Sequence, residues 1–184
     1  MLHTFVAYVE DKPGVLNRVA SLFRRRAYNI ESLAVGHTNL PGVSRMTIIV
    51  DAAGEDVARH IEANLYKLVN VLRVDDLTRL EAVAREMALI KVKATKKTRG
   101  EIVQIADIFR ANIVDDAPDN LVLEITGTVE EVDRLLKMLD QFGVSDVQRT
   151  GVIAMLRGGD ENTYDLSLLT ETTRPNDGNM QTEA

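Results

Sequence analysis

The stretch FVAYVEDKPGVLNRVASLF, residues 5–23, joins an apolar run to a segment of helical periodicity through a Pro-Gly corner. The apolar run predicts a strand over about 3–9, and the segment after the corner predicts a helix over about 14–26. Four apolar residues at i, i+3, i+4 and i+7 are expected to form the buried face of this helix: Leu16, Val19, Ala20 and Phe23. The fold is therefore expected to begin with a strand, a tight corner and a helix.

The remainder of the first 78 residues completes the order strand, helix, strand, strand, helix, strand. The turn NLPG at 39–42 separates two of the strands, and apolar and polar residues alternate in the strand that follows it. The second helix again has apolar residues at helical spacing on one face. The expected bounds of these later elements are strands at about 29–37, 45–50 and 71–77 and a helix at about 55–69.

A repeat of the same order in the second half decides the fold class. The apolar residues of the first helix recur at a constant offset of 86 residues as Ile102, Ile105, Ala106 and Phe109. The other expected elements are strands at about 88–94, near 113, at 121–126 and at 144–155, and a helix at about 132–142. The chain is therefore predicted to be α+β, with two ferredoxin-like βαββαβ units. Each unit should be a four-stranded antiparallel sheet with two helices on one face.

The sequence divides into a unit at 1–78, a linker at 79–84, a second unit at 85–158 and a tail at 159–184. The tail has six acidic residues against one arginine, so most of the formal net charge of −6 lies there. It has little periodicity, and we expect it to be largely disordered. Such a tail is either a solvated terminus or a segment that binds a partner.

Composition places the chain among ordinary globular proteins, at 45% hydrophobic and 27% charged residues. There is no cysteine, which excludes disulfides and fits a reducing compartment. The N-terminal residues lack the basic region and the long apolar run of a signal peptide, and no segment is long enough to span a membrane. We therefore expect a cytoplasmic protein.

Apolar residues on the strand at 29–37 predict self-association. Ala34 and Val35 lie on that strand, beside Tyr28 and Ile30. Two units with helices on one face also leave open sheet faces and strand edges, which favour pairing with another chain. We expect the first unit to form at least a homodimer.

Metal, catalytic and nucleic-acid sites find little support in the sequence. His3, His37 and His60 fall on different predicted elements without an HxH or HxxH pair, and each is expected at the surface or at a sheet edge. The sequence contains neither a phosphate-binding glycine loop nor a motif for a serine nucleophile. RNA recognition on this fold uses aromatic residues for base stacking, and only four Phe and four Tyr occur. We predict no catalytic residue, no metal site and no nucleic-acid binding.

The Pro-Gly corner is a better candidate site. The start of a helix exposes unpaired N–H groups with partial positive charge, and Gly14 permits close approach to the backbone. The amides of Gly14, Val15 and Leu16 are therefore candidates to bind a carboxylate, and Asp11 is a candidate to bind an ammonium group. Together they describe a site for a free amino acid. The alternative is that Asp11 caps the helix and the corner only turns the chain, and the spacing fits both equally well.

The same residues resemble a known family. DKPGVL at 11–16, followed by NIESL at 29–33, resembles the ACT domain, an amino-acid-sensing βαββαβ module. Longer motifs in both halves resemble the regulatory small subunit of acetolactate synthase, also called acetohydroxyacid synthase. These motifs are RRAYNIESLAV at 25–35, SRMTI at 44–48, LYKLVNVLRVDDL at 65–77, REMALIKVKA at 85–94, ADIFRANIVD at 106–115, LEITGT at 123–128 and RTGVIAMLRG at 149–158.

The resemblance implies a regulatory protein with no catalytic site and no cofactor of its own. In this family the small subunit binds a catalytic large subunit that holds thiamine diphosphate, Mg²⁺ and FAD, and it raises the activity of that subunit. It also confers feedback inhibition by valine or another branched-chain amino acid. The complex condenses pyruvate with pyruvate or 2-oxobutyrate, with loss of CO₂, in branched-chain amino acid biosynthesis.

The resemblance also implies an effector site between two ACT domains, so that the unit at 1–78 would bind the effector and dimerise. One chain would contribute Asp11, Gly14, Val15 and Leu16, and its partner would contribute Asn29 and Ile30. The family often has Asn at position 11. The alternative function is a stand-alone amino-acid-sensing ACT protein that regulates another enzyme.

Overall fold

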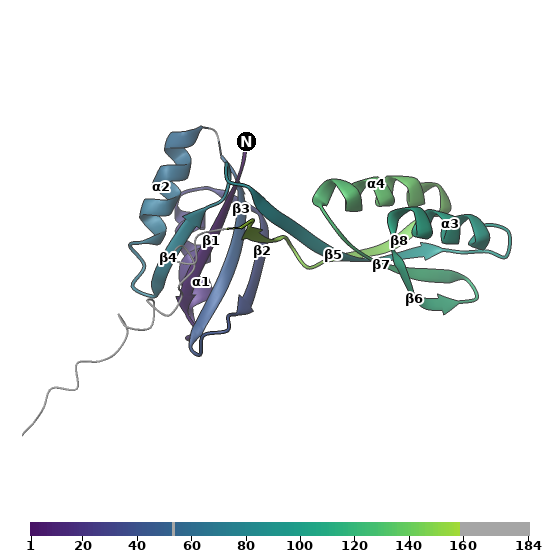
Figure 1. The fold of residues 1–184 in the computed structure, drawn as a ribbon, viewed down its shortest axis with the longest axis horizontal. Helices are drawn as coiled ribbons and strands as arrows, with labels where there is room; N and C mark the ends of the chain where they lie inside the picture. Colours follow the sequence, from purple (N-terminus) through teal and green to yellow (C-terminus); the bar gives the residue numbers. More distant parts are fainter. Residues whose placement is uncertain (53, 159–184) are drawn as a thin grey trace, which may run out of the picture.

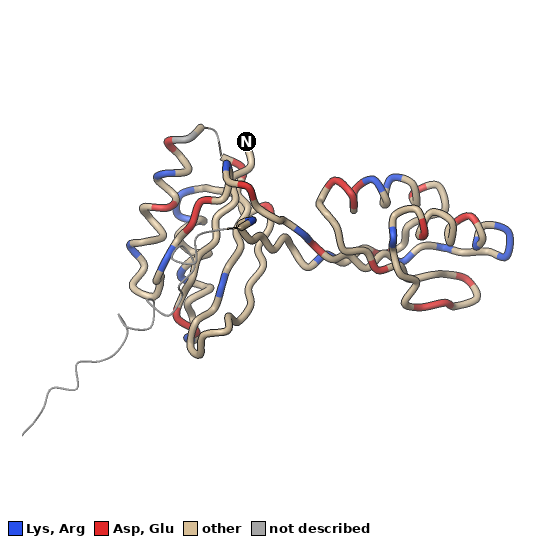
Figure 2. The backbone as a smooth tube through the Cα atoms, viewed as in Figure 1, with Lys and Arg blue, Asp and Glu red and all other residues tan. Residues whose placement is uncertain are grey.

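The computed structural model describes residues 1–52 and 54–158, which form two units side by side along the long axis of the molecule (Figure 1). Each unit is an antiparallel sheet with two α-helices, so the predicted α+β class and the repeated βαββαβ order are confirmed. The predicted tail at 159–184 lies outside the described residues. Lys, Arg, Asp and Glu are spread over both units (Figure 2).

The first unit is a four-stranded sheet with strand order β2-β3-β1-β4, in which neighbouring strands are antiparallel. Its elements are β1 (Leu2–Glu10), α1 (Val15–Arg25), β2 (Asn29–His37), β3 (Val43–Asp51), α2 (Glu55–Leu65) and β4 (Val71–Asp76). The order places β2 and β4 at the two edges of the sheet. The second helix is shorter than the sequence predicts, because it ends at Leu65 rather than near residue 69.

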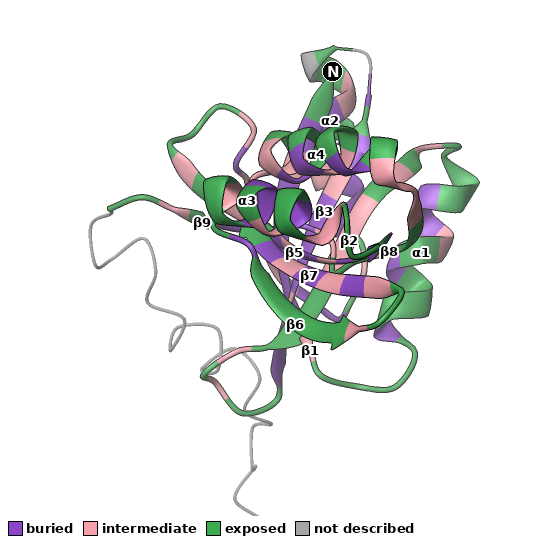
Figure 3. Ribbon diagram, turned by 90° about the vertical axis from the view of Figure 1, so that its right-hand side faces the viewer, coloured by how far each residue is buried: buried purple, intermediate pink, exposed green. Residues whose placement is uncertain are grey.

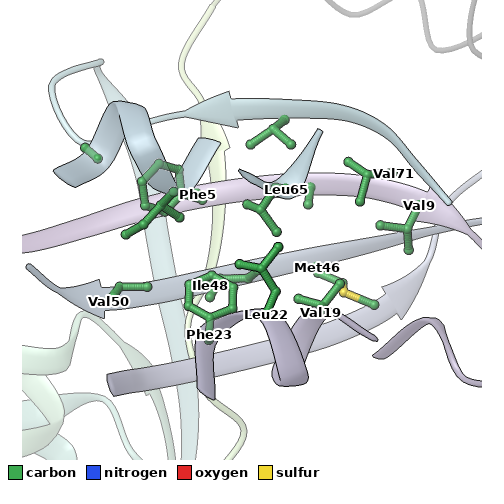
Figure 4. Close-up of a cluster of buried hydrophobic side chains, with 14 of the residues drawn as sticks. Phe5, Val9, Val19, Leu22, Phe23, Met46, Ile48, Val50, Leu65 and Val71 are labelled. Atoms are coloured by element: carbon green, nitrogen blue, oxygen red, sulfur yellow. The ribbon is translucent and has the colours of Figure 1, made fainter. Parts of the chain in front are cut away.

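The core of the first unit lies between one face of this sheet and the two helices. Side chains alternate along β1, so Phe5, Ala7 and Val9 point to the helices and are completely buried. Figure 4 shows Phe5 and Val9 of β1 packed with side chains from α1, α2 and β3 in this layer. Burying one such large apolar side chain contributes roughly 1.5–3 kcal/mol to folding.

The helical phase of α1 differs from the sequence prediction. Val15, Val19, Leu22 and Phe23 are buried, whereas Leu16 is 45% exposed and Ala20 is also exposed. The buried residues follow the spacing i, i+4, i+7 and i+8. This spacing fits helical periodicity as well as that of the predicted set does. The prediction for Leu16 and Ala20 was therefore wrong, because the pattern is compatible with two rotations of the helix.

The second unit has strand order β6-β7-β5-β8, with α3 and α4 on one face. Its elements are β5 (Ala82–Lys93), α3 (Arg99–Phe109), β6 (Asn112–Ala117), β7 (Asn120–Gly127), α4 (Val129–Leu139), a 3₁₀ turn at Asp140–Phe142 and β8 (Val144–Arg149). Ile102, Ile105 and Ala106 form the buried face of α3, as the repeat predicts, and Phe109 packs against the same core half-buried. The edge strand β6 is exposed along nearly all of its length (Figure 3).

The strand predicted over 144–155 is two strands, β8 and β9 (Ile153–Leu156). The chain breaks between them at Gly151, which has a φ of +81° and so leaves the extended conformation. Strand β8 pairs with the second half of β5, and β9 pairs with its first half, at Ala82–Arg85. Strand β5 therefore begins within the segment 79–84 that was expected to be a linker, and it runs from one unit into the other (Figure 1).

The two-stranded ribbon of β9 and the start of β5 covers the sheet face of the first unit that lies opposite its helices. Val6 and Tyr8 of β1 are buried there with Val43, Leu77 and Ala154. This face was expected to stay open, and that expectation was wrong. The predicted self-association stays a prediction. Among the described elements of the first unit, the outer edges of β2 and β4 remain unpaired.

Candidate effector site

The sequence-predicted site residues Asp11 and Gly14 lie in the loop between β1 and α1, where the start of the helix is uncapped and accessible. Gly14 is the N-cap of α1 and has a φ of +84°, in the left-handed region that glycine adopts without strain. Among the described residues no side chain caps this helix end, so Asp11 does not cap α1. Space around Gly14 is also free, because a Cβ added there would have no heavy atom within 4 Å.

Three backbone amides at the start of α1 are available to a ligand. Within residues 1–52 and 54–158, the N–H groups of Gly14, Leu16 and Asn17 donate no hydrogen bond. The amide of Val15 is bonded to the carbonyl of Lys12 at 3.3 Å, so Val15 is a weaker donor candidate than the sequence suggested. The first turn has no acidic residue, and the partial positive charge of the helix end is therefore unopposed. This set of groups suits an anion such as a carboxylate.

Asp11 connects this loop to the edge strand. Its carboxylate lies 3.3 Å from Nδ1 of His37, the last residue of β2. The His37 side chain is largely solvent-exposed, and that of Asp11 is about half exposed. Its backbone amide donates to the carbonyl of Gly42 at 2.8 Å, which fixes the loop against the β2–β3 turn. A carboxylate accepts several hydrogen bonds, so this oxygen pair has room for an ammonium group beside the imidazole.

A polar network that the sequence analysis missed supports the same loop. The side-chain amide of buried Asn70 donates to Glu10, and its oxygen accepts a hydrogen bond from Arg18 of α1. Hydrogen bonds from Asn70 and from Lys12 hold the pKa of Glu10 below its ordinary value. The sequence feature that could have indicated this network is Asn70 itself, a lone polar residue inside the apolar run LVNVL at 68–72. The network fixes the last residue of β1 relative to the first turn of α1.

Asn29 and Ile30 lie far from this loop in a single chain. Asn29 pairs with Asp51 at one end of β3, whereas His37 pairs with Ser44 at the other end. One chain therefore brings Asp11 and Gly14 together but places Asn29 and Ile30 at the opposite end of β2. Of the apolar side chains expected in the pocket, Val15 is buried in the core and Leu16 is exposed.

The histidines and acids do not form a metal site within the described residues, where no group of three or more potential ligands comes together. His37 and His60 are exposed, as expected, but His3 is buried at 2% exposure, so the prediction of a surface position was wrong for it. His3 lies on the helix-facing side of β1, where its ring stacks on Phe5. No helix in the described part of the chain is both long and apolar enough to cross a membrane.

Comparison with known proteins agrees with this architecture. Residues 5–73 match the ACT domain of the small subunit of acetohydroxyacid synthase, and residues 85–158 match the small subunit of acetolactate synthase. The probable acetolactate synthase small subunit of Archaeoglobus fulgidus is 46% identical over 159 residues, which cover 86% of this chain and 98% of that one. The chain belongs to the acetolactate synthase small-subunit family.

Two further members support the assignment. The acetolactate synthase small subunit of Mycolicibacterium smegmatis is 44% identical over 85% of this chain and 91% of its own length. The crystal structure of the Thermotoga maritima small subunit superposes with a TM-score of 0.81 at 39% identity, and the match covers 87% of this chain and 99% of that one. This chain is accordingly a small, regulatory subunit of acetolactate synthase, and its first unit is an ACT domain.

Proposed function

We propose that this chain is the non-catalytic subunit that binds and activates the large subunit of acetolactate synthase and makes it sensitive to valine. Family membership over both units carries this proposal. Thiamine diphosphate, Mg²⁺ and FAD are expected in the large subunit, which would condense two 2-oxo acids in branched-chain amino acid biosynthesis. The small subunit would act in the cytoplasm and contribute no reacting group.

The effector site is proposed to form between two copies of the ACT domain. If two β2 edges pair antiparallel about Leu33, the partner's Asn29 comes to lie opposite His37, and His37 is already in contact with Asp11. The same symmetry operation creates two equivalent sites, as in any isologous dimer. This arrangement unites Asp11 and Gly14 with the partner's Asn29 and the partner's Ile30, which one chain keeps apart.

Each part of a valine molecule finds a matching group in this site. The free amides at the start of α1 would bind the carboxylate, and Asp11 would bind the ammonium group. The exposed side chain of Leu16 and the partner's Ile30 would contact the apolar side chain. Branched-chain amino acids differ by one methylene or by its position, and a methylene in such a pocket is worth about 1–3 kcal/mol. Discrimination among them is therefore expected to be modest.

Inhibition follows from linkage between effector binding and the state of the complex. Valine shifts the complex toward the dimer arrangement that it binds more tightly, and it inhibits if that arrangement lowers the activity of the large subunit. The difference in the binding free energy of valine for the two arrangements sets the largest shift in their equilibrium that valine can cause. Tight binding alone would produce no regulation.

Reconstitution with the purified large subunit tests this function. The chain should co-purify with the large subunit, raise its turnover of pyruvate, and make that turnover fall as valine is added. Leucine and isoleucine serve as comparison effectors. A chain that neither binds nor activates the large subunit would instead support the stand-alone ACT protein, and turnover by the isolated small subunit would contradict a non-catalytic role.

A further inference from the structure

A hollow of about 530 Å³ lies on the ribbon-covered side of the ACT sheet. Strands β1 and β3, the β2–β3 turn and β9 surround it, and its lining includes Tyr8, His37, Arg45, Met155, Leu156 and Gly158. Basic and apolar groups therefore share one concave surface. We refer to this surface as the β9 hollow.

Arg45 is the group in the β9 hollow that most needs a partner. Its guanidinium donates one hydrogen bond to the carbonyl of Ala154 and lies 5.7 Å from the centre of the Tyr8 ring. Its Nε is buried without a hydrogen bond, and none of the described carboxylates pairs with it. A half-buried cation without a counter-ion is costly, and a carboxylate in the hollow would remove that cost.

The chain leaves the described structure at the rim of the hollow. Gly158 lines the hollow, and the sequence continues from residue 159 as GDENTYDLSLL. This segment contains Asp160, Glu161 and Asp165, followed by three leucines. Ten residues can span up to roughly 35 Å, so tether length does not prevent any of these residues from reaching the hollow. The acids could form an ion pair with Arg45, and the leucines could make apolar contacts with Met155 and Leu156.

We propose that residues 160–169 of the same chain dock in the β9 hollow, with an acid on Arg45 and leucines against Met155 and Leu156. A short tether gives a local concentration in the millimolar range, so even weak intrinsic affinity suffices for docking. The matched family region ends at residue 158, so this segment lies beyond the part that the family comparison explains.

Docking also gives the tail a physical connection to the effector loop. His37 lines the hollow and pairs with Asp11, so a docked tail and a bound effector would each influence the position of the same imidazole. Linkage then requires that each affect the affinity of the other by the same factor. This connection rests on the proposed function, whereas docking itself does not.

The test replaces the three acids near the start of the tail in the full-length chain. The variant D160N/E161Q/D165N keeps the body intact, and E171Q/D177N/E183Q makes the same change in charge farther along the tail as a matched control. The ¹³C-methyl NMR signal of Met155, assigned with Met155→Leu, reports on the hollow without any effector or large subunit. We expect the first variant, but not the control, to move this signal to its position in a chain that ends at Gly158.

A peptide of residues 159–184 provides the second arm of the test. Added to the chain that ends at Gly158, the peptide should bind saturably at millimolar concentration and restore the Met155 signal of the full-length chain. Its affinity should fall several-fold when the salt is raised from 0.05 to 0.5 M. An unchanged Met155 signal in the first variant, or equal changes in both variants, would overturn the proposal. So would a signal that depends on protein concentration, which indicates the tail of a second copy. A response to free acetate but not to the peptide would also overturn it.

Discussion

The hydroxyl oxygen of Ser32 accepts a hydrogen bond from the backbone amide of Val152 at 2.9 Å. Ser32 lies on the edge strand β2, two residues after Ile30, and Val152 lies in the segment between β8 and β9. The bond therefore joins the strand that carries part of the proposed effector site to the second unit. It lies next to an irregularity in the pairing of β2 with β3, between Ile30 and Ser32.

Ser32→Ala should destabilise the protein by about 1–3 kcal/mol, because it leaves the amide of buried Val152 without an acceptor. Urea unfolding measures this loss. Ser21→Ala on α1 is the matched control and should change the free energy of unfolding by less than about 0.5 kcal/mol. If the two variants lose equal stability, the bond between Ser32 and Val152 is not a structural link between the units.

Gly151→Ala should also be destabilising, because Gly151 packs directly on β2. A Cβ at this position would lie 3.0 Å from the carbonyl oxygen of Leu33, and the φ of +81° adds backbone strain. We expect a loss of about 1–3 kcal/mol in thermal or urea unfolding. Gly158→Ala, at a φ of +49° with no heavy atom within 4 Å, isolates the contribution of the strain and should lose less.

Gly14→Asp should weaken valine binding at least about tenfold, whereas Gly14→Asn should change it only a few-fold. Asp and Asn have similar shapes and both tolerate positive φ, so the comparison isolates the negative charge next to the ligand carboxylate. Two like charges about 4 Å apart near a protein surface repel by about 4 kcal/mol. Isothermal titration calorimetry of each variant measures the effect. Equal affinities for the two variants would show that the ligand carboxylate does not bind at the start of α1.

Mixing two inactive variants tests whether the effector site is shared between chains. Gly14→Asp and Asn29→Asp should each reduce valine binding in a homodimer. A mixed dimer of the two has one site with both wild-type residues and one with neither. Random chain exchange makes about half of the dimers mixed, so about a quarter of the total binding capacity should return, as measured by calorimetry. A mixture that binds no better than either variant alone would place the whole site within one chain.

Asn70→Ala should cost about 1–3 kcal/mol near neutral pH, because it removes the buried hydrogen bonds to Glu10 and Arg18. The pKa of Glu10 is lowered in the folded chain, so its contribution is complete above the ordinary value of 4.5 and is lost as the pH falls below it. The difference from the wild type should therefore shrink with acidification in urea unfolding. For Asn17→Ala, which removes an exposed side chain, the difference should stay constant with pH.

Local patterns predicted the elements of this fold well. The offset of 86 residues identified the repeated helix, an apolar run located β1, and strand alternation located β3 and the second half of β5. The rotation of α1 was not predictable, because Val15 and Leu16 satisfy the helical period equally well and only packing against β1 chooses between them. His3 was likewise misplaced, since the sequence does not reveal which sheet face a helix will cover.

Long-range relationships were the part that the sequence could not supply. Nothing in RTGVIAML at 149–156 indicates that β9 pairs with a different half of β5 than β8 does. The hydrogen bonds of Asn70 with Arg18 and Glu10 join residues 52 and 60 apart, so no local pattern encodes them. For the candidate site, the sequence located the loop and its amides, but the pairing of Asp11 with His37 depends on the β2–β3 turn reaching the loop.

Strand β5 is a single strand of 12 residues. Its first half pairs with β9 over the sheet of the ACT domain, and its second half is a central strand in the sheet of the second unit. A loop between domains bends at little cost, but a strand paired along both halves resists bending, because its ladder hydrogen bonds would have to lengthen. Rotation of the second unit relative to the ACT domain must therefore shear the ribbon across Val6 and Tyr8 or twist β5 along its length. The shared strand therefore restricts the relative orientation of the two units more than a flexible linker would.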